Sequence, residues 1–258
     1  MSWLARSGAL LATVGLLAAC GKSDPSTSTS RHASAASGGE RARALAFARA
    51  VNLTAAEVPG FHVSAKQKEH ETPSEKRLKQ KLAACVHPVT ATPLAEAGSP
   101  DFERSEGLGT ASVQSEVTVT SSAAVAAKEL ALVRSKRTRE CVSRYIQLLV
   151  HAQKHPGASY GAVSVVQRTP AAPGADGSFA WRISMPITVH GITLGIYFDI
   201  FGFVAGPHEV TLFVSGAPLP PSARAEELLF GLLLAKAKAG GKGQPGGPTG
   251  PNPNLTTS

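Results

Sequence analysis

Aromatic residues are scarce in this 258-residue chain, and so are cysteine and the signatures of common enzymes. Aromatic side chains make up 5% of the sequence, so aliphatic packing must dominate any core. Neither Ser-x-x-Lys nor His-Glu-x-x-His occurs, and no Cys-x-x-Cys pair is present. From these absences we expect no enzyme activity, no bound metal and no cofactor.

An apolar run near the N-terminus is too short to cross a bilayer. It covers 9–17, whereas a membrane-spanning helix needs about 20 apolar residues. Its length is that of the hydrophobic region of a secretory signal. The segment that closes it, Leu17-Ala18-Ala19-Cys20, resembles the lipobox of bacterial lipoproteins. That resemblance implies diacylglycerol on the Cys20 sulfur, cleavage before Cys20 and a mature chain held on the extracytoplasmic side of the cell membrane. An ordinary secretory signal with a chance cysteine is the alternative.

The two other cysteines, Cys85 and Cys141, then lie in an oxidising compartment. Two remaining cysteines in an exported chain most simply form one disulfide. Catalytic or metal-binding cysteine chemistry is the alternative. His151 and His155 have a spacing that suits a metal, but Pro156 puts them at a fraying helix end. We therefore predict the Cys85–Cys141 bridge and no metal site.

The chain is basic, with 26 Lys and Arg residues against 18 Asp and Glu residues. Arg31, Arg41 and Arg43 follow the predicted anchor closely enough to be attracted to an anionic lipid surface. No basic segment is interleaved with aromatic residues in the way typical of nucleic-acid interfaces. We expect the membrane, and not nucleic acid, to be the partner of this charge.

Composition divides the chain into four segments. Residues 1–19 form the predicted lipoprotein signal peptide, and residues 20–38 form a Ser/Thr-rich tether. Residues 239–258 are a Gly/Pro-rich tail, which cannot bury enough apolar surface to order itself. The remaining segment, 39–238, is long enough for one domain with a sizeable core.

The N-terminal part of this domain has the periodicity of helices and one strand. Apolar residues at helical spacing predict a helix over 40–51 and a second, charged helix over 74–86. Alternation over 109–120 predicts a strand, and Ser122 is placed to cap the helix that follows. The apolar stripe is then interrupted near Ser135, which indicates two helices and not one.

The C-terminal half alternates as β-structure does. One strand is predicted over 160–168, and three more form an antiparallel meander with turns at His190-Gly191 and Gly206-Pro207. Pro186, in the first strand of the meander, predicts an edge or a bulge there. A last helix over 222–238 is apolar nearly all round, so we expect it to pack deeply. The elements together predict an α+β fold with helices flanking an antiparallel sheet.

Asp199 is a carboxylate in the most apolar predicted strand, between Tyr197 and Phe201. A buried carboxylate needs a partner, and unusual carboxylates gather in binding clefts. One interpretation is that Asp199 faces water or pairs with Arg182 on the neighbouring strand. The other assigns Arg182, Tyr197, Asp199 and Phe201 to a ligand-binding cleft.

The order of these elements resembles small lipid-anchored actinobacterial proteins with a PsbP-like fold, and the exported sensor domains of mycobacterial kinases of the PknH type. The matching features are an Ala-rich first helix, a Leu-Thr-x-x-x-x-Pro-Gly segment at 53–60, a cysteine after a charged helix, a strand–helix unit with a second cysteine, a late meander and a Leu-rich last helix. The resemblance covers 39–238. It implies an antiparallel sheet flanked by helices, with a cleft suited to binding.

The sequence thus favours a non-enzymatic, lipid-anchored envelope protein that binds a small or apolar ligand, or another envelope component, between sheet and helix. The alternative is a structural or assembly factor whose basic surface contacts the membrane or cell-wall polymers. A sizeable apolar cleft would favour the first function, and a filled sheet–helix interface with a basic stripe would favour the second.

Overall fold

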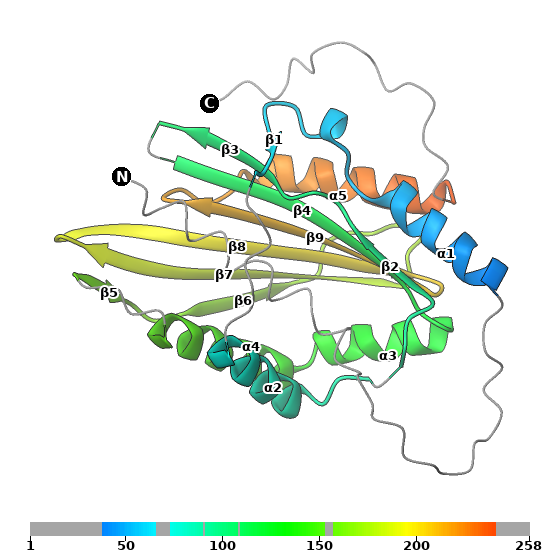
Figure 1. Cartoon of the computed structure of the whole chain (residues 1–258), viewed down its shortest axis with the longest axis horizontal. Helices are drawn as coiled ribbons and strands as arrows, with labels where there is room; N and C mark the ends of the chain where they lie inside the picture. The colour runs from blue at the N-terminus through cyan, green and yellow to red at the C-terminus, as the bar shows by residue number, and fades with distance from the viewer. Residues whose placement is uncertain (1–37, 66–72, 90, 108, 153–156, 241–258) are drawn as a thin grey trace.

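The computed structural model describes residues 38–65, 73–89, 91–107, 109–152 and 157–240. The predicted signal peptide, Cys20, most of the tether and nearly all of the tail lie outside these residues. Helices cover both faces of an open antiparallel sheet, so the predicted α+β class is confirmed (Figure 1). The helices are α1 Gly38–Val51, α2 Pro73–Val86, α3 Ala123–Val133, α4 Lys136–Ala152 and α5 Ala223–Lys238. None of the helices in the described residues is long and apolar enough to span a membrane.

The sheet has nine strands, which run in the order β1-β3-β4-β9-β8-β7-β5, with β2 also paired to β4 and β6 to β7. The strands are β1 His62–Val63, β2 Ala95–Gly98, β3 Phe102–Glu106, β4 Gly109–Val119, β5 Ala158–Tyr160, β6 Ser164–Arg168, β7 Gly177–Val189, β8 Ile192–Ala205 and β9 His208–Ala217. In Figure 1, α1 and α5 lie above the sheet, and α2, α3 and α4 lie below it. Because helices cover both faces, the central strands carry few residues that face water.

Two hydrophobic cores result, one on each face of the sheet. Alternate residues of β4, among them Val113 and Val117, are buried on the side of α1 and α5. Alternate residues of β7, among them Trp181 and Ile183, are buried on the side of α2 and α4. The period-two pattern of the sequence therefore assigned these side chains to faces correctly.

Local signals in the sequence are confirmed at the helix junction and at the hairpin turn. Ser122 caps α3 by accepting a hydrogen bond from the Val125 backbone N–H at 3.3 Å. Two helices meet near Ser135, as predicted, because α3 ends at Val133 and α4 begins at Lys136. His190 and Gly191 both have positive φ, at 50° and 80°, as a tight turn between two strands requires.

The single strand predicted over 160–168 is wrong, because β5 ends at Tyr160 and β6 begins at Ser164. Both pair with β7, on either side of Pro186. Proline has no N–H to donate, so the ladder along this side of β7 cannot be continuous. Pro186 still accepts one hydrogen bond, from the Gly161 N–H at 2.8 Å. The prediction of an edge or a bulge at Pro186 is therefore wrong, because β7 is not an edge strand and its register with β8 continues through Pro186 and Gly195. The proline instead separates β5 from β6.

The last helix, expected to pack deeply because it is apolar nearly all round, does so on one face only. α5 buries one face, which includes Phe230, Leu233 and Leu234. Leu228 is 46% exposed on the other side. Since α5 is the outer layer on its face of the sheet, only one stripe of it can meet the core.

The predicted disulfide is confirmed. Cys85, near the end of α2, is bonded to Cys141 in α4, with their Cα atoms 5.8 Å apart. Arg137 adds a hydrogen bond from its Nε to the Cys85 carbonyl oxygen at 2.7 Å. The two helices therefore form a cross-linked pair on one face of the sheet.

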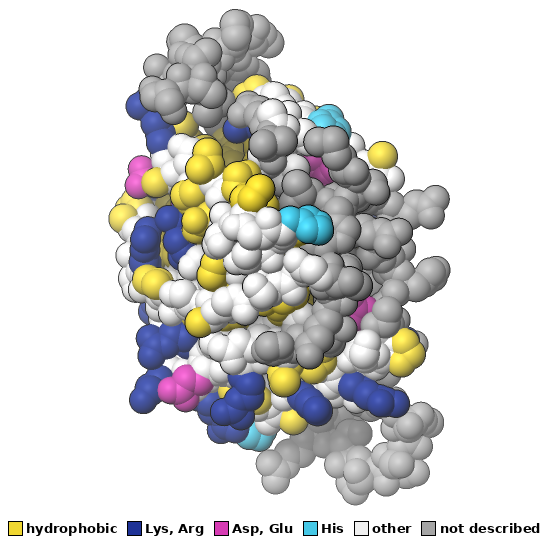
Figure 2. Space-filling view, turned by 90° about the vertical axis from the view of Figure 1, so that its left-hand side faces the viewer, with side chains coloured by type: hydrophobic (Ala, Val, Ile, Leu, Met, Phe, Trp, Pro, Cys, Tyr) yellow, Lys and Arg dark blue, Asp and Glu magenta, His cyan; other side chains and the backbone are white. Residues whose placement is uncertain are grey.

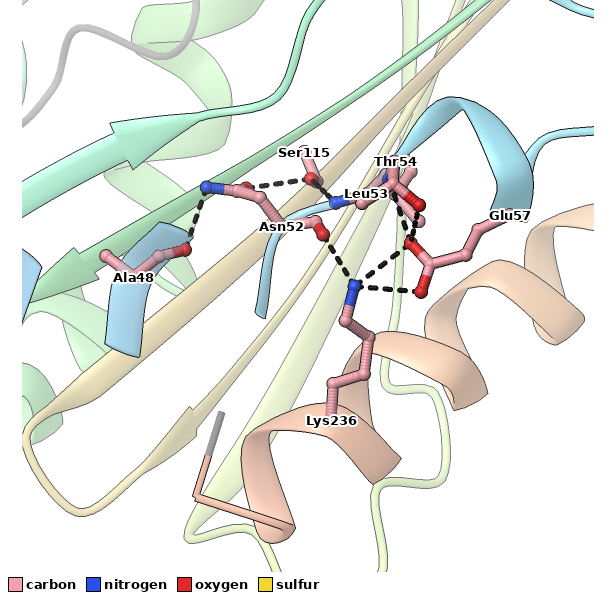
Figure 3. A network of polar contacts seen from close by, with 7 residues as sticks. All are labelled: Ala48, Asn52, Leu53, Thr54, Glu57, Ser115 and Lys236. Carbon is pink, nitrogen blue, oxygen red and sulfur yellow. Dashed lines mark hydrogen bonds and ion pairs between the residues drawn. The ribbon is translucent and has the colours of Figure 1, made fainter. Parts of the chain in front are cut away.

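Lys236 of α5 is buried beside the turn that follows α1 (Figure 3). Its Nζ donates to the Asn52 carbonyl oxygen at 2.6 Å and to the two carboxylate oxygens of Glu57 at 2.9 and 3.0 Å. Glu57 also accepts from the Thr54 N–H at 2.8 Å. Three acceptors satisfy the buried ammonium group, so this contact ties the last helix to the first turn of the fold.

Asn52 carries the same network into the sheet (Figure 3). Its side-chain amide donates to the carbonyl oxygens of Ala48 at 3.0 Å and Ala97 at 2.7 Å. Its Oδ1 accepts from the Ser115 hydroxyl at 2.8 Å, and Ser115 Oγ in turn accepts from the Leu53 N–H at 2.9 Å. Every polar group of the buried Asn52 side chain therefore has a partner.

Lys236→Met is expected to lower the free energy of unfolding by about 2–3 kcal/mol, because it leaves the Asn52 carbonyl and the partly exposed Glu57 carboxylate without their cation. The measurement is the urea midpoint. Lys238→Met, at an exposed position two residues later, is the matched control and should change the free energy by no more than about 0.5 kcal/mol. Equal effects of the two substitutions would contradict a structural role for Lys236.

Candidate ligand cavity

A cavity of about 120 Å³ lies between the sheet and the helices α3 and α4. Strands β4, β7, β8 and β9 form its floor with side chains that point away from α1 and α5. The apolar part of the lining includes Leu130, Val133, Phe179, Trp181, Ile200 and Phe213. Predominantly apolar walls with a few polar groups are typical of small-molecule sites.

Three carboxyl groups contribute the polar part of the lining. Glu116 comes from β4, Glu209 from β9 and Glu129 from α3. The register pairs Thr118 with Glu209 and Glu116 with Thr211, so both strand carboxyls are on the same face. Glu129 acts on Glu209 through its charge and hydrogen bonding, which raise the pKa of Glu209.

Burial in this setting perturbs both strand carboxyls. Desolvation, followed by the hydrogen bond and charge of Glu129 and by the charge of Glu116, raises the pKa of Glu209 to about 9. Desolvation and the neighbouring Glu96 of β2 raise the pKa of Glu116 to about 8. A carboxyl raised this far is mostly protonated at neutral pH and is able to donate a hydrogen bond.

Trp181 forms part of the cavity wall and is only 2% exposed. Its indole N–H has no hydrogen-bond partner in the described part of the chain, and neither has Oε1 of Glu209. Phe179 meets Trp181 edge to face, with ring centroids 6.1 Å apart. Unpartnered buried polar atoms are rare in native proteins, so a donor and an acceptor on one cavity call for an explanation.

The four residues predicted as a ligand site lie on the opposite face of the sheet. Asp199 is 2% exposed and accepts two hydrogen bonds from Arg182, from Nε at 2.7 Å and from Nη2 at 2.8 Å. Arg182 Nη2 also contacts Glu226 of α5 at 3.3 Å. Phe201 packs against Phe230, with centroids 5.9 Å apart. The arrangement agrees with the interpretation in which Arg182 pairs with Asp199, and the described hydrogen bonds do not include the Tyr197 side chain.

Burial perturbs this ion pair as well. The hydrogen bond from Arg182 to Asp199 raises the pKa of the guanidinium further above its ordinary value. Desolvation and the neighbouring Asp199 raise the pKa of Glu226 to about 8, against the opposing effect of Arg182. One positive charge, on Arg182, therefore faces two buried carboxyl groups, those of Asp199 and Glu226.

The chain contains one Gly-x-Ser-x-Gly match, at 157–161, which the expectation of no hydrolase signature missed. In hydrolases this signature places the serine on a sharp turn between a strand and a helix. Here Ser159 lies within β5, paired with Thr188 of β7, and is exposed. The match therefore lacks the geometry of a nucleophile. The side chains of His151 and His155, whose spacing suits a metal, lie outside the described residues.

We expect stability to fall as the pH rises from about 5 to about 9. In the unfolded chain Glu209 ionises near its ordinary pKa of 4.5, whereas in the folded protein it keeps its proton up to about 9. Between these pH values unfolding releases a proton. Each pH unit therefore lowers the free energy of unfolding by up to about 1.4 kcal/mol for one such carboxyl. Thermal midpoints across this range measure the slope.

Glu209→Gln imitates the protonated group and should flatten this slope relative to the unmodified chain. The exposed Glu227→Gln, on α5, is the control and should leave the slope unchanged. A slope that is the same in all three proteins would rule out a raised Glu209 pKa.

Comparison with known proteins gives little beyond this geometry. No family model and no curated protein matches the chain. Among solved structures, the extracellular domain of PknH from Mycobacterium tuberculosis is similar at a TM-score of 0.26 and 9% identity. The match covers 66% of this chain and 98% of that one. It agrees in part with the predicted resemblance to exported sensor domains, and a similarity this weak fixes no function.

Proposed function

We propose that this chain is a lipid-anchored, non-enzymatic envelope protein that binds a small ligand in the cavity between the sheet and α3. The observation that carries the proposal is the unpartnered indole N–H of Trp181 in a predominantly apolar cavity wall. A hydrogen-bonding ligand would satisfy it, and burial of the ligand against aromatic side chains would supply the affinity.

The test uses Trp181 as its own reporter. The chain has two tryptophans, Trp3 and Trp181, so Trp3→Phe in the full chain leaves the cavity as the only source of tryptophan fluorescence. A panel of small amines, acids, alcohols and sugars is titrated against this protein, with thermal shift as a second readout. Saturable quenching or enhancement with a rise in melting temperature supports the proposal.

A filling variant locates the bound compound. Thr211→Leu adds volume to the cavity wall and should weaken binding by about tenfold or more, at a folding cost of about 1–3 kcal/mol. Thr110→Leu makes the same change at an exposed position of β4 and should leave binding intact. Equal binding by both variants, or no hit in the panel, contradicts a ligand site here.

The anchor is a separate part of the proposal, supported by Leu17-Ala18-Ala19-Cys20 alone. Intact mass of the protein from host membranes should show a diacylglyceryl adduct on a chain that begins at Cys20. Cys20→Ala should shift the protein from the membrane to the soluble fraction. Membrane association without an adduct, or unchanged by the substitution, contradicts lipidation.

The basic surface of α2 and α4 favours a second candidate function, contact with an anionic lipid surface. The two helices carry eight Lys and Arg residues against two Glu residues, a net charge of 8 − 2 = +6. Figure 2 shows Lys and Arg side chains gathered along the lower end of one face, the level at which Figure 1 draws these helices. Basic residues near an anionic leaflet contribute about 1 kcal/mol each.

Vesicle sedimentation distinguishes this function from ligand binding. Full chain carrying Cys20→Ala, which removes the proposed anchor, should bind anionic vesicles and not neutral ones, and should be released by salt. Neutralising Lys76, Arg77 and Lys81 to Gln should weaken binding strongly. Neutralising Arg41, Arg43 and Arg49, which are exposed on α1, is the charge-matched control. Equal weakening by both triple variants contradicts a specific α2/α4 surface.

A further inference from the structure

The cavity carboxyls belong to a group of four acidic residues without a counter-charge. Glu96, Glu116, Glu129 and Glu209 come from β2, β4, α3 and β9. After desolvation, Glu96 raises the pKa of Glu116, and Glu129 and Glu116 raise the pKa of Glu209. In the described part of the chain no Lys, Arg or His lines the cavity. The guanidinium of Arg134, the residue after the end of α3, is hydrogen-bonded to the Ser178 carbonyl oxygen. Glu116 and Glu209, the two members of the group with raised pKa values, are therefore carboxyls that a positive charge in the cavity would ionise.

Trp181 supplies the second, independent observation. It is almost completely buried, it lines the same cavity, and its N–H has no acceptor within the described residues. Phe179 and Phe213 complete an aromatic wall beside it. The faces of aromatic rings attract cations, most strongly where water is excluded.

These features together select among ligand classes. A cation favours ionisation of the carboxyls, whereas an anion would oppose it, and a purely apolar ligand would leave the carboxyls and the indole N–H unsatisfied. In the described chain no three His, Cys, Asp or Glu side chains come together in a way that could hold a metal ion. The cavity, at about 120 Å³, is slightly smaller than the apolar cavity of about 150 Å³ that takes benzene in another protein.

We infer that the cavity binds a small organic cation, with its ammonium group at Glu116, Glu129 and Glu209, its alkyl part on the aromatic wall, and an acceptor atom on the indole N–H of Trp181. The inference rests on the proposed function, since it names the ligand class of that cavity. It also states what determines the affinity: the charge of the ligand, and not its apolar area.

Binding of such a cation must displace protons. In the empty cavity Glu116 and Glu209 are largely protonated at neutral pH, because their pKa values are raised to about 8 and about 9. An ammonium group stabilises the carboxylate form, so the carboxyl proton leaves to solvent as the cation enters. Affinity therefore rises with pH until the empty cavity ionises by itself, near pH 8–9.

The test compares choline with its uncharged isostere, in which carbon replaces the quaternary nitrogen. Choline keeps its charge at every pH and carries a hydroxyl oxygen for Trp181. Calorimetry on the full chain with Trp3→Phe, in two buffers of different ionisation enthalpy, counts the protons released. We expect choline to bind at least about tenfold more tightly than the isostere, to tighten from about pH 6 to about pH 8, and to release protons.

Variants assign the effect to the carboxyls. Glu209→Gln should weaken choline binding by about tenfold or more and leave the isostere unchanged, with circular dichroism confirming that the variant is folded. The exposed Glu227→Gln should bind choline as the parent does. Loss of choline binding in Glu209→Gln with an unfolded spectrum is resolved by Glu129→Gln, whose carboxyl comes from α3 and not from the sheet.

The outcomes separate this inference from the proposed function. If the isostere binds as well as choline, or choline binding ignores pH and Glu209→Gln, the cation inference is overturned while the cavity remains a ligand site. If neither probe binds but a neutral or acidic compound from the panel does, the cation inference is also overturned and the cavity remains a ligand site. If nothing binds, both proposals fail.

Discussion

Replacing Arg182 with methionine is expected to destabilise the protein by about 3–5 kcal/mol, the largest single-residue effect that the fold suggests. The guanidinium holds the buried Asp199 through two hydrogen bonds, at 2.7 and 2.8 Å, and reaches Glu226 at 3.3 Å. Both carboxyl side chains are only 3% exposed. Removal of the cation leaves them buried without compensation, and urea denaturation measures the loss.

Two further variants show whether the ion pair is the cause. Arg144→Met removes an exposed arginine of α4 and should cost no more than about 0.5 kcal/mol. Adding Asp199→Leu to Arg182→Met should recover much of the lost stability, because a buried apolar residue replaces an unpaired carboxylate. If the double variant is no more stable than Arg182→Met, repulsion and desolvation at Asp199 are not what the arginine relieves.

Removing the disulfide should cost about 4 kcal/mol in the chain-entropy description, because Cys85 and Cys141 are 56 residues apart in sequence. The double variant Cys85→Ala/Cys141→Ala should unfold at a lower urea concentration than the parent by that amount. Chemical reduction of the parent should produce the same shift.

The double variant also serves as the control for the reductant, since its midpoint should not respond to reduction. Mass spectrometry with and without alkylation confirms the oxidation state of each sample. A parent protein that is fully reduced by this criterion, yet keeps its midpoint, would show that packing between α2 and α4 suffices without the bond.

Sequence reasoning predicted the fold best where the determining signals are local. The meander follows from alternation and from the turn chemistry of His190 and Gly191, and the turn then fixes the register. Counting outward from it pairs Arg182 with Asp199, so the ion pair was accessible from the sequence. The helix junction near Ser135 and the cap at Ser122 are equally local.

What could not be predicted depends on residues far apart in sequence. Strands β2 and β3 are short, and they form because each pairs with the backbone of β4. The break between β5 and β6 is set by Pro186 on a different strand.

The cavity needs the β4–β9 register, which pairs Thr118 with Glu209 across about 90 positions of chain. Alternation over 109–120 predicts only a strand, and it does not show that a second layer of helices covers the polar positions of β4. The sequence predicted helices flanking the sheet, but not that they cover the face of β4 and β9 that carries Glu116 and Glu209.

The pairing of early with late segments has a consequence for the order of events during synthesis. β4 meets its central partner β9 only after the chain has been made to residue 217, and Lys236 closes the contact with Asn52 later still. A nascent chain that lacks these segments exposes one edge of β4 and lacks residues of both cores, so it cannot complete either core. The fold is therefore complete only when almost all of the polypeptide has been translated, and late completion of a fold is compatible with passage of the chain through an export channel before it folds outside.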